Sequence, residues 1–192
     1  MTEEEKTERG LFYKAYVGCG DANTPEEVFP LIIRIAKYLD NMGYVLRVSG
    51  VSIPDEAFLS GAVREPEIYL PWKEFNNKTS KTYRYPEAAK SLTLRYHRNF
   101  ANYKLPAQAM AIRNTCMVEG KYLTSRASLI ICWTPDGCES SVTRSAKTGF
   151  TAPIITMATE LNIPIFNLKN PDAPERLKEH LSYWDIPRRP KE

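Results

Sequence analysis

The sequence predicts an α/β domain, a Rossmann-like three-layer sandwich around a mostly parallel sheet of five or more strands. Short apolar runs, rich in β-branched and aromatic residues, alternate along the chain with segments of helical periodicity. Parallel strands covered by helices on both faces are apolar along their whole length, and these runs have that character. The predicted strands are residues 12–18, 44–48, 67–70, 127–133 and 163–168.

The helices between these strands are predicted from their first residues and from the glycines that end them. Thr24-Pro25-Glu26-Glu27 indicates a helix that ends near Gly43, and Pro30 is expected to kink it or delay its start. Ser52-Ile53-Pro54-Asp55 indicates a second helix that ends at Gly61. Further helices are predicted over residues 86–98, 106–119, 148–162 and 174–183.

Length and composition favour one domain of a cytoplasmic protein. The 192 residues suffice for one full hydrophobic core, with a charged N-terminal extension at 1–11, a long loop at 71–85 and a polar tail at 184–192. The N-terminus lacks the apolar core of a signal peptide, and no apolar run approaches the roughly 20 residues that span a bilayer. We therefore expect a cytoplasmic location, no membrane partner and a homo-oligomer.

Charge and cysteine spacing say little about ligands. The net charge of +3 neither requires nor excludes nucleic acid as a partner. The four cysteines form no CxxC pair, and no Cys/His cluster has the spacing of zinc ligands. Cys116 and Cys132 are expected to be buried thiols. No metal and no cofactor are predicted.

Three polar segments follow predicted strands, at the end of the sheet where open α/β sheets bind ligands. A glycine-bearing turn, Gly18-Cys19-Gly20-Asp21, follows the first strand, and Ser49-Gly50 follows the second. The loop from Thr134 to Thr151 follows the fourth strand and leads into a helix. Because these strands are predicted to be parallel, we expect Gly18, Ser49, Gly50, Thr134 and Thr151 to meet in one crevice.

Each candidate residue also has a purely structural interpretation. Thr148, Gly149 and Thr151 suit an anion at a helix N-terminus, but one threonine is enough for an ordinary cap. Ser49-Gly50 equally suits a tight turn. Asp55 could hold a ribose hydroxyl, although it is also the third residue of a capping box, and the cap is favoured.

Arg113 and Asn114 lie on an otherwise apolar predicted helix. An arginine there could bind a phosphate with two parallel hydrogen bonds, or it could be an exposed helix residue. Trp133 could stack on a base. Glu139 is the one acid between Asp136 and Thr151, and we consider it as a general acid, although loop acids are usually solvated.

Several motifs resemble those of phage-encoded DprA/Smf-like proteins, members of the SLOG (LOG/DprA) Rossmann-like superfamily. Residues 16–25 resemble a YxGxGSRxTP opening, and residues 46–62 resemble LRSGGAxGADxAFxxGA. Residues 67–76 match EIYLPWxxFN and residues 132–137 match CWTPDG, the two most specific motifs. Residues 149–168 resemble GGTGQAIxIA followed by IPVFNL, and an RN pair resembles Arg113-Asn114. The likeness extends from about residue 12 to residue 168.

The chain departs from the resemblance at its phosphate-facing positions. The family's Ser-Arg is Gly20-Asp21 here, the paired glycine of SGGA is Gly50-Val51, and the GGTG loop is Gly149-Phe150-Thr151-Ala152. A side chain at such a position blocks close approach of the backbone to a diphosphate. The glutamate that follows the PGGxGTxxE loop of LOG-like hydrolases is absent here.

The resemblance implies three functions, which the sequence leaves open. The first is binding of a nucleoside phosphate or nucleotide-derived ligand, with degenerate N-glycosidic hydrolase chemistry and slow or no turnover. The second is DprA-like binding of single-stranded DNA in recombination, for which basic and aromatic side chains would form a groove. The third is a non-catalytic sensor or sponge for a nucleotide signal. The DNA-binding candidates are Lys73, Lys78, Lys81, Arg84 and Lys90, interleaved with Tyr83 and Tyr85.

Overall fold

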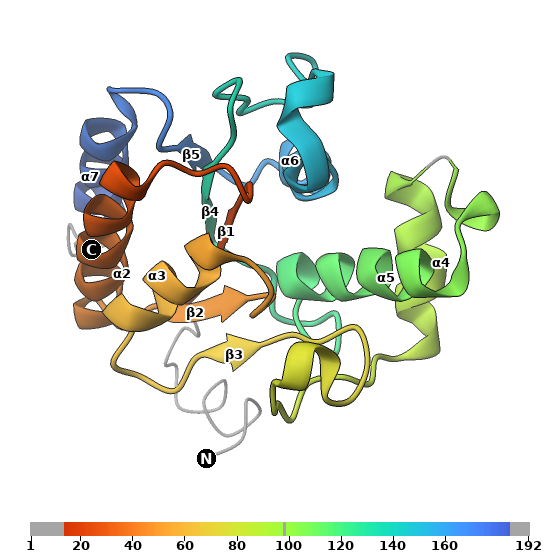
Figure 1. Ribbon diagram of the computed structural model, residues 1–192. Helices are drawn as coiled ribbons and strands as arrows, with labels where there is room; N and C mark the ends of the chain where they lie inside the picture. The colour runs from red at the N-terminus through yellow and green to blue at the C-terminus, as the bar shows by residue number, and fades with distance from the viewer. Residues whose placement is uncertain (1–13, 98, 185–192) are drawn as a thin grey trace, which may run out of the picture.

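The computed structural model describes residues 14–97 and 99–184, and it confirms the predicted fold class. The described residues form one sheet of five parallel strands in the order β3-β2-β1-β4-β5 (Figure 1). The chain thus moves outward from β1 to β3, crosses back and continues from β4 to β5. The strands are β1 Ala15–Gly20, β2 Val45–Val48, β3 Glu67–Ile68, β4 Leu129–Trp133 and β5 Ile165–Asn167.

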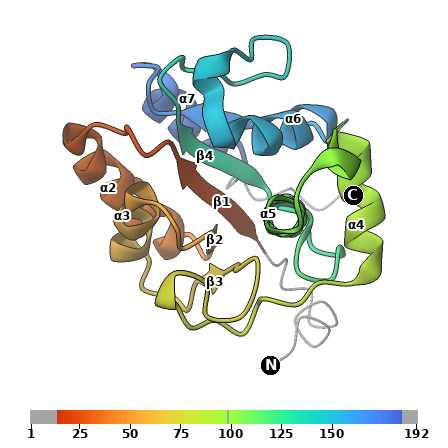
Figure 2. The same cartoon turned by 45° about the vertical axis from the view of Figure 1, so that its right-hand side comes forward.

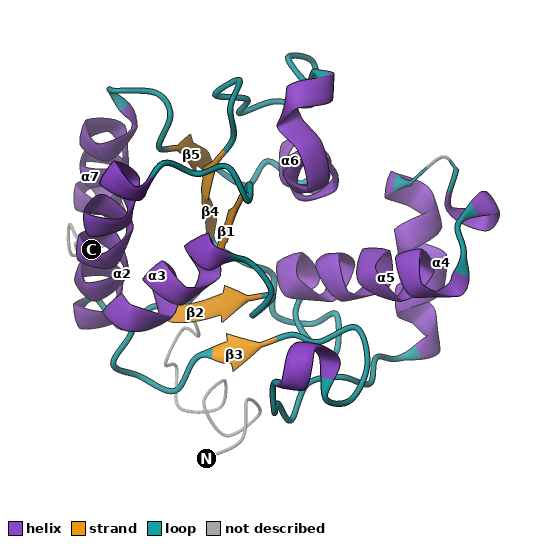
Figure 3. Cartoon of the chain, in the orientation of Figure 1, coloured by secondary structure: helices purple, strands orange, loops and turns teal. Residues whose placement is uncertain are grey.

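Helices cover both faces of the sheet, which makes the three layers (Figure 3). Helices α2, α3 and α7 pack on one face, and α4, α5 and α6 pack on the other. Figure 2 shows α5 lying between the sheet and α4. The α-helices are α2 Phe29–Asn41, α3 Ile53–Gly61, α4 Glu87–Tyr96, α5 Leu105–Glu119, α6 Ala152–Glu160 and α7 Ala173–Trp184. The 3-10 segments are η1 Glu26–Val28, η2 Phe75–Asn77, η3 Phe100–Asn102 and η4 Ala146–Thr151.

Alternation along each strand divides the buried side chains between two cores. On β1, Tyr16 joins the core beneath α2, α3 and α7, whereas Val17 joins the core beneath α4, α5 and α6. On β4, Ile131 and Ile130 divide in the same way. Successive strand side chains point to opposite faces, so a strand buried on both sides must be apolar throughout. That requirement explains the continuous apolar runs in the sequence.

The predicted glycine turn after the first strand is wrong. Gly18, Cys19 and Gly20 belong to β1, where they pair with Ile131, Cys132 and Trp133 of β4. The prediction placed the strand end at residue 18 because glycine disfavours strands in isolation. Pairing with a fully buried neighbouring strand overrides that preference. The start of the predicted strand, residues 12 and 13, lies outside the described residues.

The other element boundaries differ from prediction by a few residues. Pro30 delays its helix: η1 occupies Glu26–Val28, and α2 begins at Phe29 with Pro30 in its first turn. Proline is tolerated there because the first turn has no intrahelical acceptor for its missing N–H. Beyond the end of β3, the N–H of Tyr69 still donates to the carbonyl of Val48 on β2, and residues 69 and 70 otherwise pair with Thr82, through an isolated bridge and a backbone hydrogen bond.

Gly18 allows α3 to pack closely on the sheet. A Cβ atom at this position would lie 2.8 Å from two ring carbons of Phe58, which is fully buried on α3. At Gly20 a Cβ atom would lie 2.9 Å from Cβ of Pro54, at the start of the same helix. The absence of side chains at these two positions therefore serves helix packing, which differs from the ligand-binding role predicted for them.

This packing role predicts that Gly18→Ala lowers the free energy of unfolding. The added methyl group collides with Phe58, so we expect a loss of roughly 1–3 kcal/mol, typical of overpacked cores, measured by urea unfolding. In the double variant Gly18→Ala/Phe58→Leu the smaller side chain relieves the collision, and the two changes should be less than additive. A Gly18→Ala variant as stable as the parent would show that Phe58 yields without cost and that packing does not require this glycine.

Candidate functional site

The loops that follow β1, β2 and β4 lie together at the carboxyl end of the sheet, because those strands are parallel neighbours in the order β2-β1-β4. The N–H of Asp21, after β1, donates to the carbonyl of Trp133 at the end of β4. The carboxylate of Asp21 lies 3.0 Å from the position that a Cβ atom of Gly149 would occupy. Asp21 and Gly149, two candidate site residues that are far apart in the sequence, therefore lie next to each other.

Arg113 of α5 has the most unusual environment in this region. Its side chain is buried, with 7% of the residue exposed. One terminal nitrogen, Nη1, donates to the carbonyls of Ser49 and Tyr69, at 3.5 Å in both cases, the limit of hydrogen-bond length. Its Nε has no hydrogen-bond partner among the described residues. Burial lowers the pKa of Arg113, but a guanidinium in a protein stays protonated.

The acid nearest to Arg113 in this electrostatic environment, Asp55, favours its charged form but does not form an ion pair with it. Burial lowers the pKa of Arg113, while the nearby Tyr85, Asp55 and Cys19 act in the opposite direction, which places all three close to the guanidinium. Asp55 is the acid among them, and its Oδ2 accepts hydrogen bonds from the Ser49 hydroxyl at 2.5 Å and from the N–H groups of Val51 and Ser52 at 2.9 and 3.2 Å. Within residues 14–97 and 99–184, no carboxylate forms a salt bridge with Arg113.

Asp55 thus has the capping role that the sequence favoured. It accepts from the N-cap backbone of α3 as the third residue of a capping box. The same carboxylate holds the Ser49 hydroxyl, so Ser49 supports the turn at the end of β2. Gly50 in that turn has a φ of +65°, a conformation that favours glycine. These three candidates shape the loop beside Arg113.

A second buried arginine, Arg47 of β2, was not singled out from the sequence. Its Nε donates to Glu67 of β3 at 2.8 Å, and its terminal nitrogens donate to the carbonyl and hydroxyl of Ser125 at 2.7 and 3.0 Å. Arg47 and Glu67 are register partners on neighbouring strands, so opposite charges on adjacent apolar runs were the available signal. Its charge is neutralised and well hydrogen-bonded, which is the usual state of a buried arginine.

A second polar network holds the loop between β4 and α6. Asp136 accepts hydrogen bonds from the hydroxyls of Thr134, Ser145 and Thr148 and from the N–H of Cys138, at 2.8, 2.5, 2.6 and 3.3 Å. Desolvation raises the pKa of this carboxyl, but the four hydrogen bonds outweigh it and hold the pKa well below its usual range. Thr134 also accepts from the side chain of Asn167, at the end of β5.

This network uses the groups that the sequence predicted for an anion at the helix start. The Thr148 hydroxyl is buried, donates to Asp136 and accepts from the N–H of Ser145. The 3-10 segment η4 separates these residues from α6, which begins at Ala152. Gly149 interrupts η4 with φ +60° and ψ −142°, and Thr151 is buried. The residues around Thr148 therefore stabilise the loop, and Arg113 is the better-placed group for an anion.

The remaining candidates have other surroundings. Trp133 packs in the core beneath α2, α3 and α7, on the opposite face of the sheet. Glu139 accepts from the N–H of Asn167 at 2.7 Å and from Arg176 of α7 at 2.8 Å, so its carboxylate joins β5 to α7. Asn114 is half-buried on α5 beside Arg113. Asp21 accepts from the backbone and side chain of Asn23, both at 2.8 Å.

All four cysteines are buried and unpaired, as expected for Cys116 and Cys132. Among the described residues, no three His, Cys, Asp or Glu side chains gather in a way that would hold a metal ion. In the same part of the chain, no helix is both long and apolar enough to cross a bilayer.

Comparisons with protein-family models, curated proteins and solved structures found no match to this chain. The site is therefore interpreted from its own geometry.

The role of Asp136 predicts a pH-dependent contribution to stability. Its pKa is lowered in the folded state, so the contribution is present above the unfolded-state pKa of about 3.9 and is lost as the pH falls below it. Asp136→Asn should lower the free energy of unfolding at pH 7 by about 1–2 kcal/mol, since the group is partly solvated. The difference from the parent should shrink at pH 3.

Asp172→Asn is the matched control, because Asp172 is an exposed acid in an ion pair with Arg176. We expect this change to alter the free energy of unfolding by less than about 0.5 kcal/mol at either pH. Equal effects of the two substitutions at pH 7 would contradict an organising role for Asp136.

Proposed function

We propose that the protein binds a nucleoside phosphate at the carboxyl end of its parallel sheet, with Arg113 as the anion-binding residue. The observation that carries the proposal is the buried guanidinium of Arg113, which has a free Nε, two long hydrogen bonds and no acidic partner among the described residues. Burying a charge without a partner costs several kcal/mol. An anionic ligand would supply the missing partner.

The position of Arg113 supports this assignment. Its hydrogen bonds reach the backbone that follows β2 and β3, which is the end of the sheet where α/β proteins collect their ligands. A guanidinium is also suited to phosphate, because it presents parallel N–H groups to two oxygens. The resemblance to SLOG proteins provides the reason for choosing a nucleoside phosphate among possible anions.

The environment of Glu139 supports binding without efficient N-glycosidic hydrolysis. Cleavage needs an acid near the leaving base and stabilisation of a cationic sugar. Glu139 is held in an ion pair with Arg176, and its second partner is the backbone of β5. Asp136 is ionised and surrounded by four donors. Neither carboxyl is available as a general acid beside Arg113.

The charges around the long loop favour a small ligand over single-stranded DNA. Of the five basic residues proposed for a DNA groove, three form ion pairs: Lys73 with Glu74, Lys78 with Glu56 and Lys81 with Glu65. Tyr85 is also unavailable for stacking on bases, because it stacks on Tyr69 and donates to the carbonyl of Leu70. The glutamates beside these lysines would repel the phosphates of DNA.

The binding prediction is that titration calorimetry detects association with at least one ribo- or deoxyribonucleotide and that Arg113→Met weakens it by about tenfold or more. This loss follows from removing a charge-assisted contact, worth about 1.5–3 kcal/mol. Arg34→Met, which removes an exposed arginine of α2, is the control and should bind like the parent. Binding unchanged in Arg113→Met, or no binding by the parent to any nucleotide, would contradict the proposal.

A second prediction concerns stability without ligand, where the two buried arginines should behave in opposite ways. Arg113→Met removes an unneutralised charge, so the free energy of unfolding should stay the same or rise by roughly 1–2 kcal/mol. Arg47→Met removes the ion pair with Glu67 and leaves the carbonyl and hydroxyl of Ser125 without their arginine donor, so it should lower the free energy of unfolding by at least about 2 kcal/mol. Urea unfolding measures both. Destabilisation of similar size in the two variants would indicate that Arg113 is a structural residue.

Chromatography of the same nucleotide panel tests the catalytic part of the proposal. We expect little or no free base after prolonged incubation. Fast release that is lost in Glu139→Gln would make Glu139 the catalytic acid and overturn the non-catalytic interpretation.

A further inference from the structure

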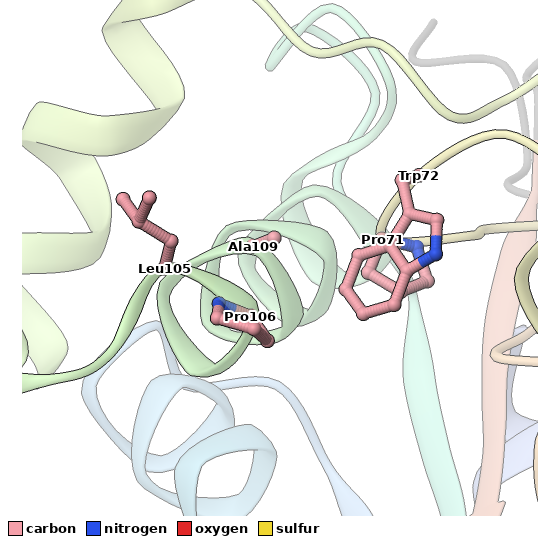
Figure 4. Close-up of a pocket in the computed structure, with 5 residues that line it drawn as sticks. All are labelled: Pro71, Trp72, Leu105, Pro106 and Ala109. Atoms are coloured by element: carbon pink, nitrogen blue, oxygen red, sulfur yellow. The ribbon is translucent and has the colours of Figure 1, made fainter.

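A shallow apolar groove lies beside Arg113, between the segment that follows β3 and the first two turns of α5. Its volume is about 330 Å³, and it is lined by Pro71, Trp72, Leu105, Pro106 and Ala109. Figure 4 shows Pro71 and Trp72 on one side and the α5 residues on the other. Trp72 keeps 40% of its surface exposed, which is high for the largest apolar side chain.

Arg113 does not line the groove, but both walls of the groove come from segments that Arg113 belongs to or contacts. On α5, Ala109 precedes Arg113 by four residues, so the two lie on the same face of the helix, about 6 Å apart along its axis. Side chains of a helix lean toward its N-terminus, which directs Arg113 toward the turn that contains Ala109. On the other wall, the carbonyl that Arg113 contacts belongs to Tyr69, two residues before Pro71.

We propose that this groove receives the base of the nucleoside phosphate whose anionic group binds Arg113, with Trp72 as the stacking residue. The inference rests on the proposed function and adds a specificity subsite to it. An apolar groove lies on one side, and the buried guanidinium of Arg113, which has no salt bridge among the described residues, lies on the other. A nucleoside phosphate has the matching parts, a planar base and an anionic group joined by one sugar. Trp72 is held in place by an edge-on contact with Phe75, with ring centroids 4.6 Å apart, so it offers an ordered face.

The groove is better suited to contact the base of a nucleotide than the polar loops are. The Ser49 hydroxyl donates a hydrogen bond to Asp55, and the hydroxyls of Thr134 and Thr148 donate hydrogen bonds to Asp136. These groups offer few free donors or acceptors to a base. The contacts that remain are stacking and apolar packing, which every base accepts. We therefore expect the site to distinguish a nucleotide from a sugar phosphate strongly and one base from another weakly.

The test compares a nucleoside monophosphate, ribose 5-phosphate and inorganic phosphate in calorimetric titrations of the full chain. The parent should bind the nucleotide about tenfold or more tightly than ribose 5-phosphate, and Trp72→Leu should remove that advantage. Ribose 5-phosphate binding should be unchanged in Trp72→Leu. Arg113→Met should weaken binding of both ligands. Tyr122→Leu, which removes an exposed aromatic residue of the loop after α5, is the control.

Ala109→Leu provides a second variant that leaves Trp72 and its contact with Phe75 in place. The larger side chain fills the groove, so nucleotide binding should fall to the level of ribose 5-phosphate. Thermal unfolding should show that both variants are folded at the temperature of the titration.

The outcomes separate the subsite from the anion site. If ribose 5-phosphate binds as tightly as the nucleotide, or if Trp72→Leu binds both ligands like the parent, the base subsite is wrong while the role of Arg113 survives. If the parent binds none of the three ligands, the proposed function itself fails. If Trp72→Leu instead changes the sedimentation of the protein and leaves nucleotide binding intact, the groove is a contact between copies of the chain.

Discussion

The pairing of β1 with β4 is the interaction on which the rest of the structure depends. Five consecutive residues of β1 are in register with five of β4, from Tyr16 with Leu129 to Gly20 with Trp133. This pairing joins the half of the sheet that contains β2 and β3 to the half that contains β4 and β5. Because parallel strands end at the same edge, it also aligns the loops that carry the candidate residues. Gly18 has no side chain at the point where Phe58 of α3 packs on β1.

Two buried arginines on neighbouring elements illustrate how a structural charge differs from a candidate functional one. Arg47 has an acidic partner and short hydrogen bonds to Ser125, so the fold itself compensates its burial. Arg113 is also buried, yet its hydrogen bonds within residues 14–97 and 99–184 are two long contacts to carbonyl oxygens. A fold that keeps an uncompensated charge gives up stability, and this is common where a residue serves binding. The contrast supports Arg113 as a ligand-binding group without any reference to related proteins.

Two aspartates organise the loops near the candidate site. Asp55 gathers a serine hydroxyl and two backbone N–H groups at the start of α3. Asp136 gathers three hydroxyls and one N–H group between β4 and α6. In both loops the hydroxyl-bearing residues that resemble phosphate ligands in the sequence are bonded to an acid of the same loop. These hydroxyls are therefore already hydrogen-bonded within the fold, whereas Nε of Arg113 has no hydrogen-bond partner among the described residues.

The sequence by itself determined the fold class, the existence of the five strands and most of the helices, because continuous apolar runs and helix caps are local signals. It also singled out Arg113 as a possible phosphate ligand, favoured Asp55 as a helix cap and placed the loop after β4 at the carboxyl end of the sheet. Only the tertiary structure decided which of these residues remain available to a ligand. Hydrogen bonds between distant residues, such as Glu139 with Arg176 and Thr134 with Asn167, leave no periodic trace in the sequence. For the same reason, burial without a partner distinguishes Arg113 from an exposed helix arginine only once β2, β3 and α5 are packed together.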